Sequence, residues 1–141
     1  MSYTFPGPEW LQAFETKLNA DDRYAHIARN WEGDILFKIE RSDGFPESMS
    51  LYLDLWHGKC RQSFIMDEDH RLEGDPAFVL AASYDNFARI LEGKLDPMQA
   101  MLARKLRVQG SMAYMMRNVP VVLDFVRCAK EVTLAGMEAE G

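Results

Sequence analysis

The sequence predicts an α+β fold in which helices pack on one face of a five-stranded, mainly antiparallel sheet. Two observations carry this prediction. Apolar residues recur every three or four positions towards both ends of the chain, as in amphipathic helices, whereas residues 35–66 alternate with a period of two, as in half-buried strands. The length of 141 residues matches the usual size of one domain, so residues 1–141 are expected to share one core.

Two helices are expected at the N-terminal end of the chain. The first begins at Pro8, because proline suits the first helical position. Its apolar stripe has helical spacing and consists of Trp10, Leu11, Phe14 and Leu18. The second follows Asp21 and Asp22, whose charges favour a helix start, and ends near Gly33.

A three-stranded antiparallel meander is expected next. Ile35, Phe37 and Ile39 alternate with Leu36, Lys38 and Glu40. Residues 49–56 alternate most cleanly, with Met49 and three leucines on one face. Turns at residues 42–44 and 57–59 separate these strands from a third at residues 61–66. One face of this meander is therefore expected to be covered by other elements.

The remaining chain supplies two further strands and four helices. Residues 77–82 are uniformly apolar, as in a strand buried on both faces, and residues 106–109 form a last short strand that ends at Gly110. Ser83 and Asp96 are expected to cap two helices between these strands. A further helix covers residues 111–117, and a separate final helix starts near Asn118 because proline follows closely.

Composition narrows the classes of function. The net charge of -6 argues against a nucleic-acid partner, because phosphate binding requires clustered lysine and arginine. No uncharged stretch is longer than nine residues, as at residues 76–84, which is too short to span a membrane. No signal peptide is visible, so a cytoplasmic protein is expected. Cys60 and Cys128 match no metal spacing and are interpreted as reduced packing thiols.

No catalytic or metal motif is visible in the sequence. It contains no Gly-rich phosphate loop, no Gly-x-Ser-x-Gly elbow and no His-Glu-x-x-His. The acidic loop at residues 67–70 lacks the glycine of a calcium loop, and His57 and His70 have no zinc-like spacing. We therefore expect no enzyme, no cofactor and no metal, although three histidines could still meet in space.

Methionine is the most distinctive feature of the composition. Five methionines fall within nineteen residues at helical spacing, and they are expected to face inward: Met98, Met101, Met112, Met115 and Met116. A flexible thioether suits either an ordinary adaptable core or the lining of a site for an apolar ligand. Both interpretations predict burial, but only the second predicts an internal void.

Three segments carry a pattern that resembles the type-2 sterol carrier protein family. Residues 83–87, 93–100 and 105–113 read SYDNF, GKLDPMQA and KLRVQGSMA, and the GKLDP step followed by KLxVxG is the most specific part. The likeness extends upstream to WEGD at residues 31–34 and covers most of the chain. Two positions depart from the pattern, because Arg104 replaces a common glycine and Ser111 a common acidic residue. The C-terminal residues also lack a peroxisomal Ser-Lys-Leu signal, which puts a sterol ligand in doubt.

The resemblance implies a non-catalytic protein whose sheet and helices enclose an apolar tunnel. Such a tunnel accepts and transfers a fatty acid, fatty acyl-CoA, phospholipid or sterol. Carried over by position, its wall consists of Met98, Met101, Leu102, Met112, Met115, Met116, Val119, Leu123 and Val126. The alternative is an accessory domain with a filled tunnel that forms a homo-oligomer or contacts an enzyme.

An unoccupied tunnel would be energetically costly. An empty tunnel of about 500 Å³ would cost roughly 12 kcal/mol, so the unliganded protein is expected to close partly, to retain water or to keep a host lipid.

The segment from Arg89 to Lys130 has eight basic and three acidic residues, which fit either solvated helix faces or contact with anionic lipid head groups. The basic residues expected to make such a contact are Lys105, Arg107, Arg117 and Lys130.

Overall fold

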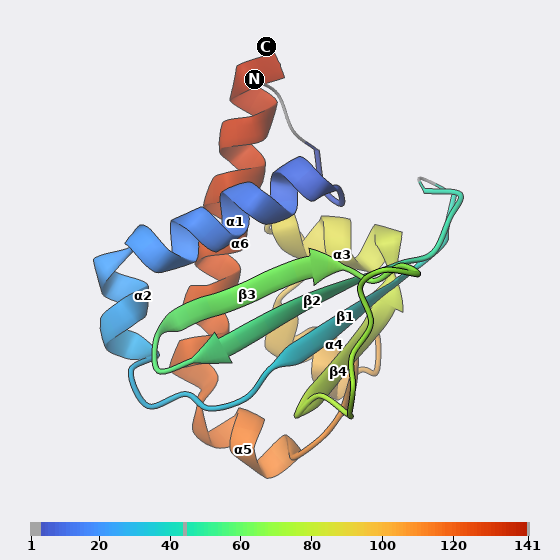
Figure 1. Cartoon of the computed structure of the whole chain (residues 1–141). Coiled ribbons are helices and arrows are strands. Elements are labelled where there is room, and N and C mark those ends of the chain that lie inside the picture. Colours follow the sequence, from blue (N-terminus) through green and yellow to red (C-terminus); the bar gives the residue numbers. More distant parts are fainter. Residues whose placement is uncertain (1–3, 44, 141) are drawn as a thin grey trace.

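The order of elements is the predicted one. A computed structural model describes residues 4–43 and 45–140, with side chains through residue 136. In chain order the elements are α1 (Pro8–Ala20), α2 (Asp22–Ile27), β1 (Ile35–Glu40), β2 (Met49–Trp56), β3 (Lys59–Ile65), β4 (Phe78–Ser83), α3 (Tyr84–Leu91), α4 (Pro97–Leu102), β5 (Arg107–Gln109), α5 (Met112–Arg117) and α6 (Val119–Glu140). The predicted α+β class is confirmed (Figure 1).

The strands form one five-stranded sheet in the order β3-β2-β1-β4-β5. β1 and β4 are parallel, and the other neighbouring pairs are antiparallel, which confirms the mainly antiparallel prediction. The register places Phe37 of β1 between Leu51 of β2 and Leu80 of β4. Because directly paired residues point to the same side, these three side chains form a continuous apolar row across the middle of the sheet.

The turn between β2 and β3 shows why the third strand starts two residues earlier than predicted. His57 and Gly58 have φ angles of 51° and 81°, as a two-residue hairpin turn with the twist of the strands requires. A side chain at Gly58 would lie 2.6 Å from the carbonyl oxygen of Ala25, so glycine also lets the turn approach α2 closely. The backbone N–H of His57 donates to the carbonyl of Trp31 at 2.7 Å, which ties the hairpin to the α2–β1 connection.

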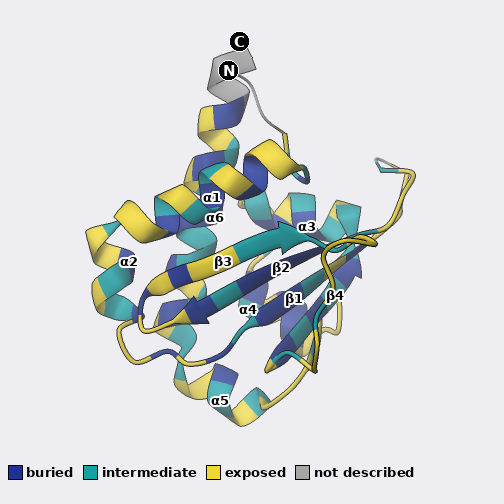
Figure 2. Cartoon of the chain, in the orientation of Figure 1, coloured by how far each residue is buried: buried dark blue, intermediate teal, exposed yellow. Residues whose placement is uncertain are grey.

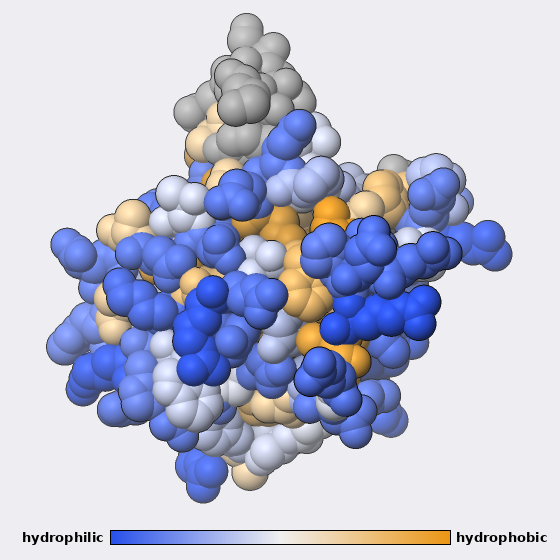
Figure 3. Space-filling view, viewed as in Figure 1, coloured by the Kyte–Doolittle hydropathy of each residue, from blue (hydrophilic) through white to orange (hydrophobic). Residues whose placement is uncertain are grey.

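The helices cover one face of the sheet, as predicted. In Figure 2, buried and exposed residues alternate along α1 and α6, as expected for helices with one covered side. On the opposite face the β3–β4 connection contributes His70, whose ring packs on Phe64, and Phe64 in turn packs on Tyr52. Figure 3 shows that hydrophilic residues dominate the side of the molecule seen in Figure 1, with a few apolar residues between them. Within the described residues, no helix combines the length and apolarity needed to cross a membrane.

α3 and α4 end in the same type of cap. After α3, the N–H groups of Gly93 and Lys94 donate to Ile90 and Arg89, which is the Schellman pattern with glycine in the left-handed position. After α4, Arg104 and Lys105 donate in the same way to Met101 and Ala100, but the left-handed residue is Arg104, at φ 61°. A left-handed backbone at this position is one that glycine adopts more readily than arginine.

This geometry generates a prediction for Arg104. A non-glycine residue in the left-handed region costs about 1–2 kcal/mol, and glycine loses about 1 kcal/mol of chain entropy. Arg104→Gly should therefore leave the free energy of unfolding unchanged or raise it by up to about 1 kcal/mol. Arg104→Val should lower it by about 1–2 kcal/mol, because a β-branched residue resists positive φ. Urea unfolding of the two variants checks this, and equal losses for both would contradict the role of the backbone angle.

Candidate functional site

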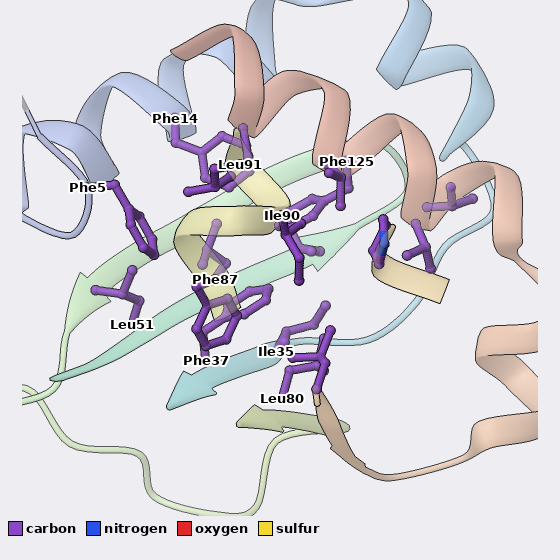
Figure 4. A pocket seen from close by; sticks show the side chains of 18 of the residues that line it. Phe5, Phe14, Ile35, Phe37, Leu51, Leu80, Phe87, Ile90, Leu91 and Phe125 are labelled. Carbon is purple, nitrogen blue, oxygen red and sulfur yellow. The ribbon is translucent and has the colours of Figure 1, made fainter. Parts of the chain in front are cut away.

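An apolar cavity of about 90 Å³ lies between the covered face of the sheet and the helices. In Figure 4, Ile35 and Phe37 of β1 project towards Phe87 and Ile90 of α3 and Phe125 of α6. The sheet supplies Ile35, Phe37, Ile39, Leu51, Leu53, Leu55 and Leu80. The rest of the wall consists of Phe5, Trp10, Phe14, Tyr24, Trp31, Phe87, Ile90, Leu91, Pro97, Met101, Leu106, Met115, Val121, Val122, Phe125, Val126 and Ala129.

Aromatic rings bridge the space between the sheet and α6. The ring of Phe37 stacks on that of Phe125, with centroids 5.8 Å apart and planes 4° apart. Phe125 also meets Phe14 of α1 edge to face at 4.9 Å, and Phe37 meets Phe87 of α3 at 6.2 Å. These rings fill the centre of the space between the sheet and the helices, which reduces the volume left for the cavity.

The volume of the cavity indicates a partly closed state. Ligand pockets usually measure about 300–1,000 Å³, and even the engineered cavity that binds benzene has about 150 Å³. The observed 90 Å³ is therefore too small for a long apolar chain unless side chains or helices move. An empty cavity of this size costs only about 2 kcal/mol, which a domain tolerates.

Three of the nine residues predicted for the wall do line the cavity. They are Met101 of α4, Met115 of α5 and Val126 of α6. Met98, Met112 and Val119 are half-buried and lie outside this lining, although both methionines pack against the core.

The expectation of an inward orientation is wrong for the other three. Leu102 is 70% exposed, Met116 46% and Leu123 44%. α4 and α5 have only six residues each, so each helix presents little more than one turn to the core. The apolar residues of α4 and α5 span a wider arc than this one turn can bury, so Leu102 and Met116 remain exposed. The sheet and α3 supply ten of the 24 wall residues and α6 another five, and the alternation in residues 35–55 was the signal for the wall residues of β1 and β2.

The four basic residues predicted to touch lipid head groups have different surroundings. Lys105 and Arg117 are exposed and have no ion-pair partner within the described part of the chain. Arg107 of β5 pairs with Glu40 of β1. Lys130 is half-buried on α6 and faces the loop that follows α3.

A second hollow, an open groove of about 600 Å³, lies between the α3–α4 loop and α6. Pro97 and Val126 line both this groove and the apolar cavity, so the two spaces adjoin. The groove differs in character, because Lys94, Lys130 and other polar side chains form much of its wall.

An ion-pair network holds α6 beside the cavity. Arg127 of α6 donates to both carboxylate oxygens of Asp124 and to Asp21, which precedes α2, at 2.7–3.1 Å. Asp124 is 3% exposed, and removing its partner would leave a buried carboxylate unpaired. Lys17 of α1 joins the network through Asp21 at 3.0 Å and Glu131 at 2.9 Å. The hydrogen bond from Arg127 holds the pKa of Asp21 well below its usual range.

The same network accounts for a group with the spacing of metal ligands. Asp21, Asp124 and Cys128 have ligand atoms within 4.8 Å of one another. Both carboxylates are already ion-paired, Asp21 with Arg127 and Lys17 and Asp124 with Arg127 and Arg23, and burial raises the pKa of the Cys128 thiol to about 11. These residues are therefore arranged as an ion-pair network with a protonated thiol beside it.

The histidines lie away from both hollows. His57 pairs with Glu32 at 2.5 Å, and His70 pairs with Asp67 at 3.0 Å. No histidine belongs to the wall of the cavity or of the groove among the residues that the structure describes.

The network generates a prediction with a defined pH dependence. Asp21→Asn should lower the free energy of unfolding at pH 7 by about 2 kcal/mol, because a charge-assisted hydrogen bond is lost beside a buried carboxylate. The lowered pKa of Asp21 means that its contribution is complete above about pH 4 and disappears as the pH falls further. The difference between wild type and variant should therefore shrink below about pH 4 in chemical unfolding. Asp22→Asn, at an exposed neighbour, is the control, and an equal loss in both variants would contradict the network's role.

Comparisons with known proteins agree with this geometry. A model of the SCP-2 sterol transfer family matches residues 11–122. A crystal structure of sterol carrier protein 2 is 30% identical with a TM-score of 0.76, and the match covers 87% of this chain and 95% of that one. The solution structure of a conserved hypothetical protein from Thermus thermophilus is 28% identical with a TM-score of 0.78, and the match covers 93% of each chain.

A more distant structure extends the comparison. Sterol carrier protein-2 from Aedes aegypti, solved in complex with the C16 fatty acid palmitate, is 19% identical with a TM-score of 0.53, and the match covers 85% of this chain and 93% of that one. A comparison with curated proteins finds no match. The family match spans most of the fold described above, including the sheet and the wall residues of the cavity from Phe14 to Val122. The chain belongs to the SCP-2 sterol transfer family.

Proposed function

We propose that this protein binds an apolar lipid in the cavity between its sheet and helices and transfers it without chemical change. The observation that carries the proposal is a wall made only of apolar and aromatic side chains, in a chain that belongs to a sterol transfer family. Burying a lipid chain there is favourable by about 0.8 kcal/mol for each methylene removed from water. A fatty acid, fatty acyl-CoA, phospholipid or sterol would each supply such a chain or ring system.

Binding requires the cavity to widen. Phe37 and Phe125 stack across it without a hydrogen bond between them, so a lipid chain can replace their mutual contact with contacts of its own. Met101 and Met115 add side chains with several rotatable bonds to the same wall. A wall of this kind adapts at low cost to chains of different length.

A non-catalytic role in the cytoplasm is part of the proposal. His57 and His70 are each paired with a different carboxylate, and neither faces the cavity. Both cysteines are buried free thiols, as expected in a reducing compartment.

The small volume of the cavity favours one alternative function. In that alternative the interior stays filled, and the protein acts as an accessory domain that pairs with itself or with an enzyme. Native mass spectrometry of the purified protein separates the two functions. A retained lipid adduct supports lipid binding, and a stable protein-only oligomer supports the accessory domain.

Two neighbouring methionines provide the sharpest test of lipid binding. Met115 is 1% exposed and lines the cavity, whereas Met116 is 46% exposed. Met115→Lys should reduce the uptake of a fluorescent fatty acid at least tenfold, because a charge in an apolar wall opposes chain burial. Met116→Lys should bind like the wild type. Saturating fatty acid should also raise the melting temperature of the wild type and of Met116→Lys. Equal uptake by both variants, with folding verified by circular dichroism, would place the ligand elsewhere.

Contact with anionic membranes is a second element of the proposal, and it rests on the exposed residues Lys105 and Arg117. Each lies next to or near an exposed apolar side chain, Met116 for Arg117 and Leu102 for Lys105. Each basic residue near an anionic surface contributes about 1 kcal/mol. Changing both to glutamine should weaken binding to vesicles containing phosphatidylserine about tenfold or more at low salt, as measured by co-sedimentation. Lys59→Gln is the control, and binding that does not change with added salt would refute an electrostatic contact.

A further inference from the structure

We propose that the groove between the α3–α4 loop and α6 holds the anionic head group, a carboxylate or a phosphate, of the lipid whose chain enters the cavity. This inference rests on the proposed function and specifies the ligand class as amphipathic and anionic. The groove and the cavity share Pro97 and Val126, so the two spaces adjoin at these side chains, and the proposed path from one to the other does not cross the sheet.

The positive charge of the groove comes from two lysines. Lys130 of α6 places its Nζ atom 3.8 Å from the position that a side chain at Gly93 would take, so the ammonium lies against the loop. It has no ion-pair partner within the described residues. Lys94, on the other side, pairs with Glu92 at 2.9 Å, but both side chains are well exposed. An exposed pair of this kind is weak, so Lys94 can exchange Glu92 for a ligand oxygen.

The acidic residues of the groove are already engaged. Asp96 accepts hydrogen bonds from the backbone N–H groups of Met98 and Gln99, at 2.7 and 3.1 Å, as the cap of α4. Glu131 pairs with Lys17 and Arg127 at 2.9 and 2.8 Å, and Arg127 is itself occupied by Asp124 and Asp21. The two lysines therefore remain as the charges able to meet an anion.

The loop that carries Lys94 is held on both sides. The cap after α3 fixes Gly93 and Lys94 through hydrogen bonds to Ile90 and Arg89, and Asp96 fixes the start of α4. Because these hydrogen bonds already order the loop, the backbone around Lys94 loses little conformational freedom when an anion binds between Lys94 and Lys130.

The test uses ligands that share one chain and differ in the head group. Dodecanoate, dodecyl phosphate and the uncharged methyl dodecanoate are titrated at low salt against the wild type, Lys94→Gln/Lys130→Gln and the control Lys38→Gln. Lys38 is exposed on β1, away from both hollows. Trp10 and Trp31 line the cavity, so their fluorescence reports entry of the chain with every ligand.

The double variant should lose about five- to tenfold in affinity for the anionic ligands, as expected for two partly exposed charge contacts, and keep its affinity for the ester within about twofold. A larger loss for dodecyl phosphate than for dodecanoate would assign the groove to phosphate, and the reverse to carboxylate. Equal losses for ester and anions, or no loss for the anions, would overturn the inference while leaving lipid binding intact. A wild type that binds none of the three ligands would instead overturn the proposed function itself.

Discussion

The contacts of Arg127 with Asp21 and of Glu131 with Lys17 keep α6 over the apolar face of the sheet. Phe125 of α6 stacks on Phe37 in the middle of that face, whereas α1 lies along the edge strand β3 (Figure 1). α6 is attached to α1 by a second polar contact, in which the Trp10 indole donates to Thr133 at 3.0 Å. Polar bonds thus fix the helix along its flank, while its apolar side meets the sheet through contacts without directional bonds.

Because polar bonds hold α6 along one side and only apolar contacts join it to the sheet, the cavity between α6 and the sheet can change volume. Directional contacts resist displacement, whereas the stacked rings of Phe37 and Phe125 exchange one apolar neighbour for another at little cost. The closed state limits the cost of an empty cavity to about 2 kcal/mol. In the proposed function, a bound lipid would remove that cost and add the favourable burial of its own apolar surface. A lipid carrier needs both properties, because it must survive without cargo and still bind cargo tightly.

The sequence predicted secondary structure best where a regular pattern of apolar residues extends over many positions. The covered face of the β1–β2 hairpin follows from alternation in residues 35–40 and 49–56, and the starts of α3 and α4 follow from the caps Ser83 and Asp96. The other helices follow from apolar residues at helical spacing. The orientation of Leu102 and Met116 could not be predicted, because helices of six residues leave the choice of buried side to tertiary packing. The groove was also invisible, since it joins Lys94 and Lys130 across more than thirty positions. Arg104 showed a departure from the family pattern, but its left-handed backbone required coordinates.

The most direct measurement is isotope-filtered nuclear Overhauser spectroscopy of the protein with ¹³C-labelled palmitate. If the cavity widens around the chain, the labelled methylenes will show contacts with methyl groups of Leu53 and Met115 from opposite walls at once. Contacts confined to exposed methyl groups such as those of Leu102 and Met116, with the interior resonances unchanged, would contradict a lipid site inside this fold.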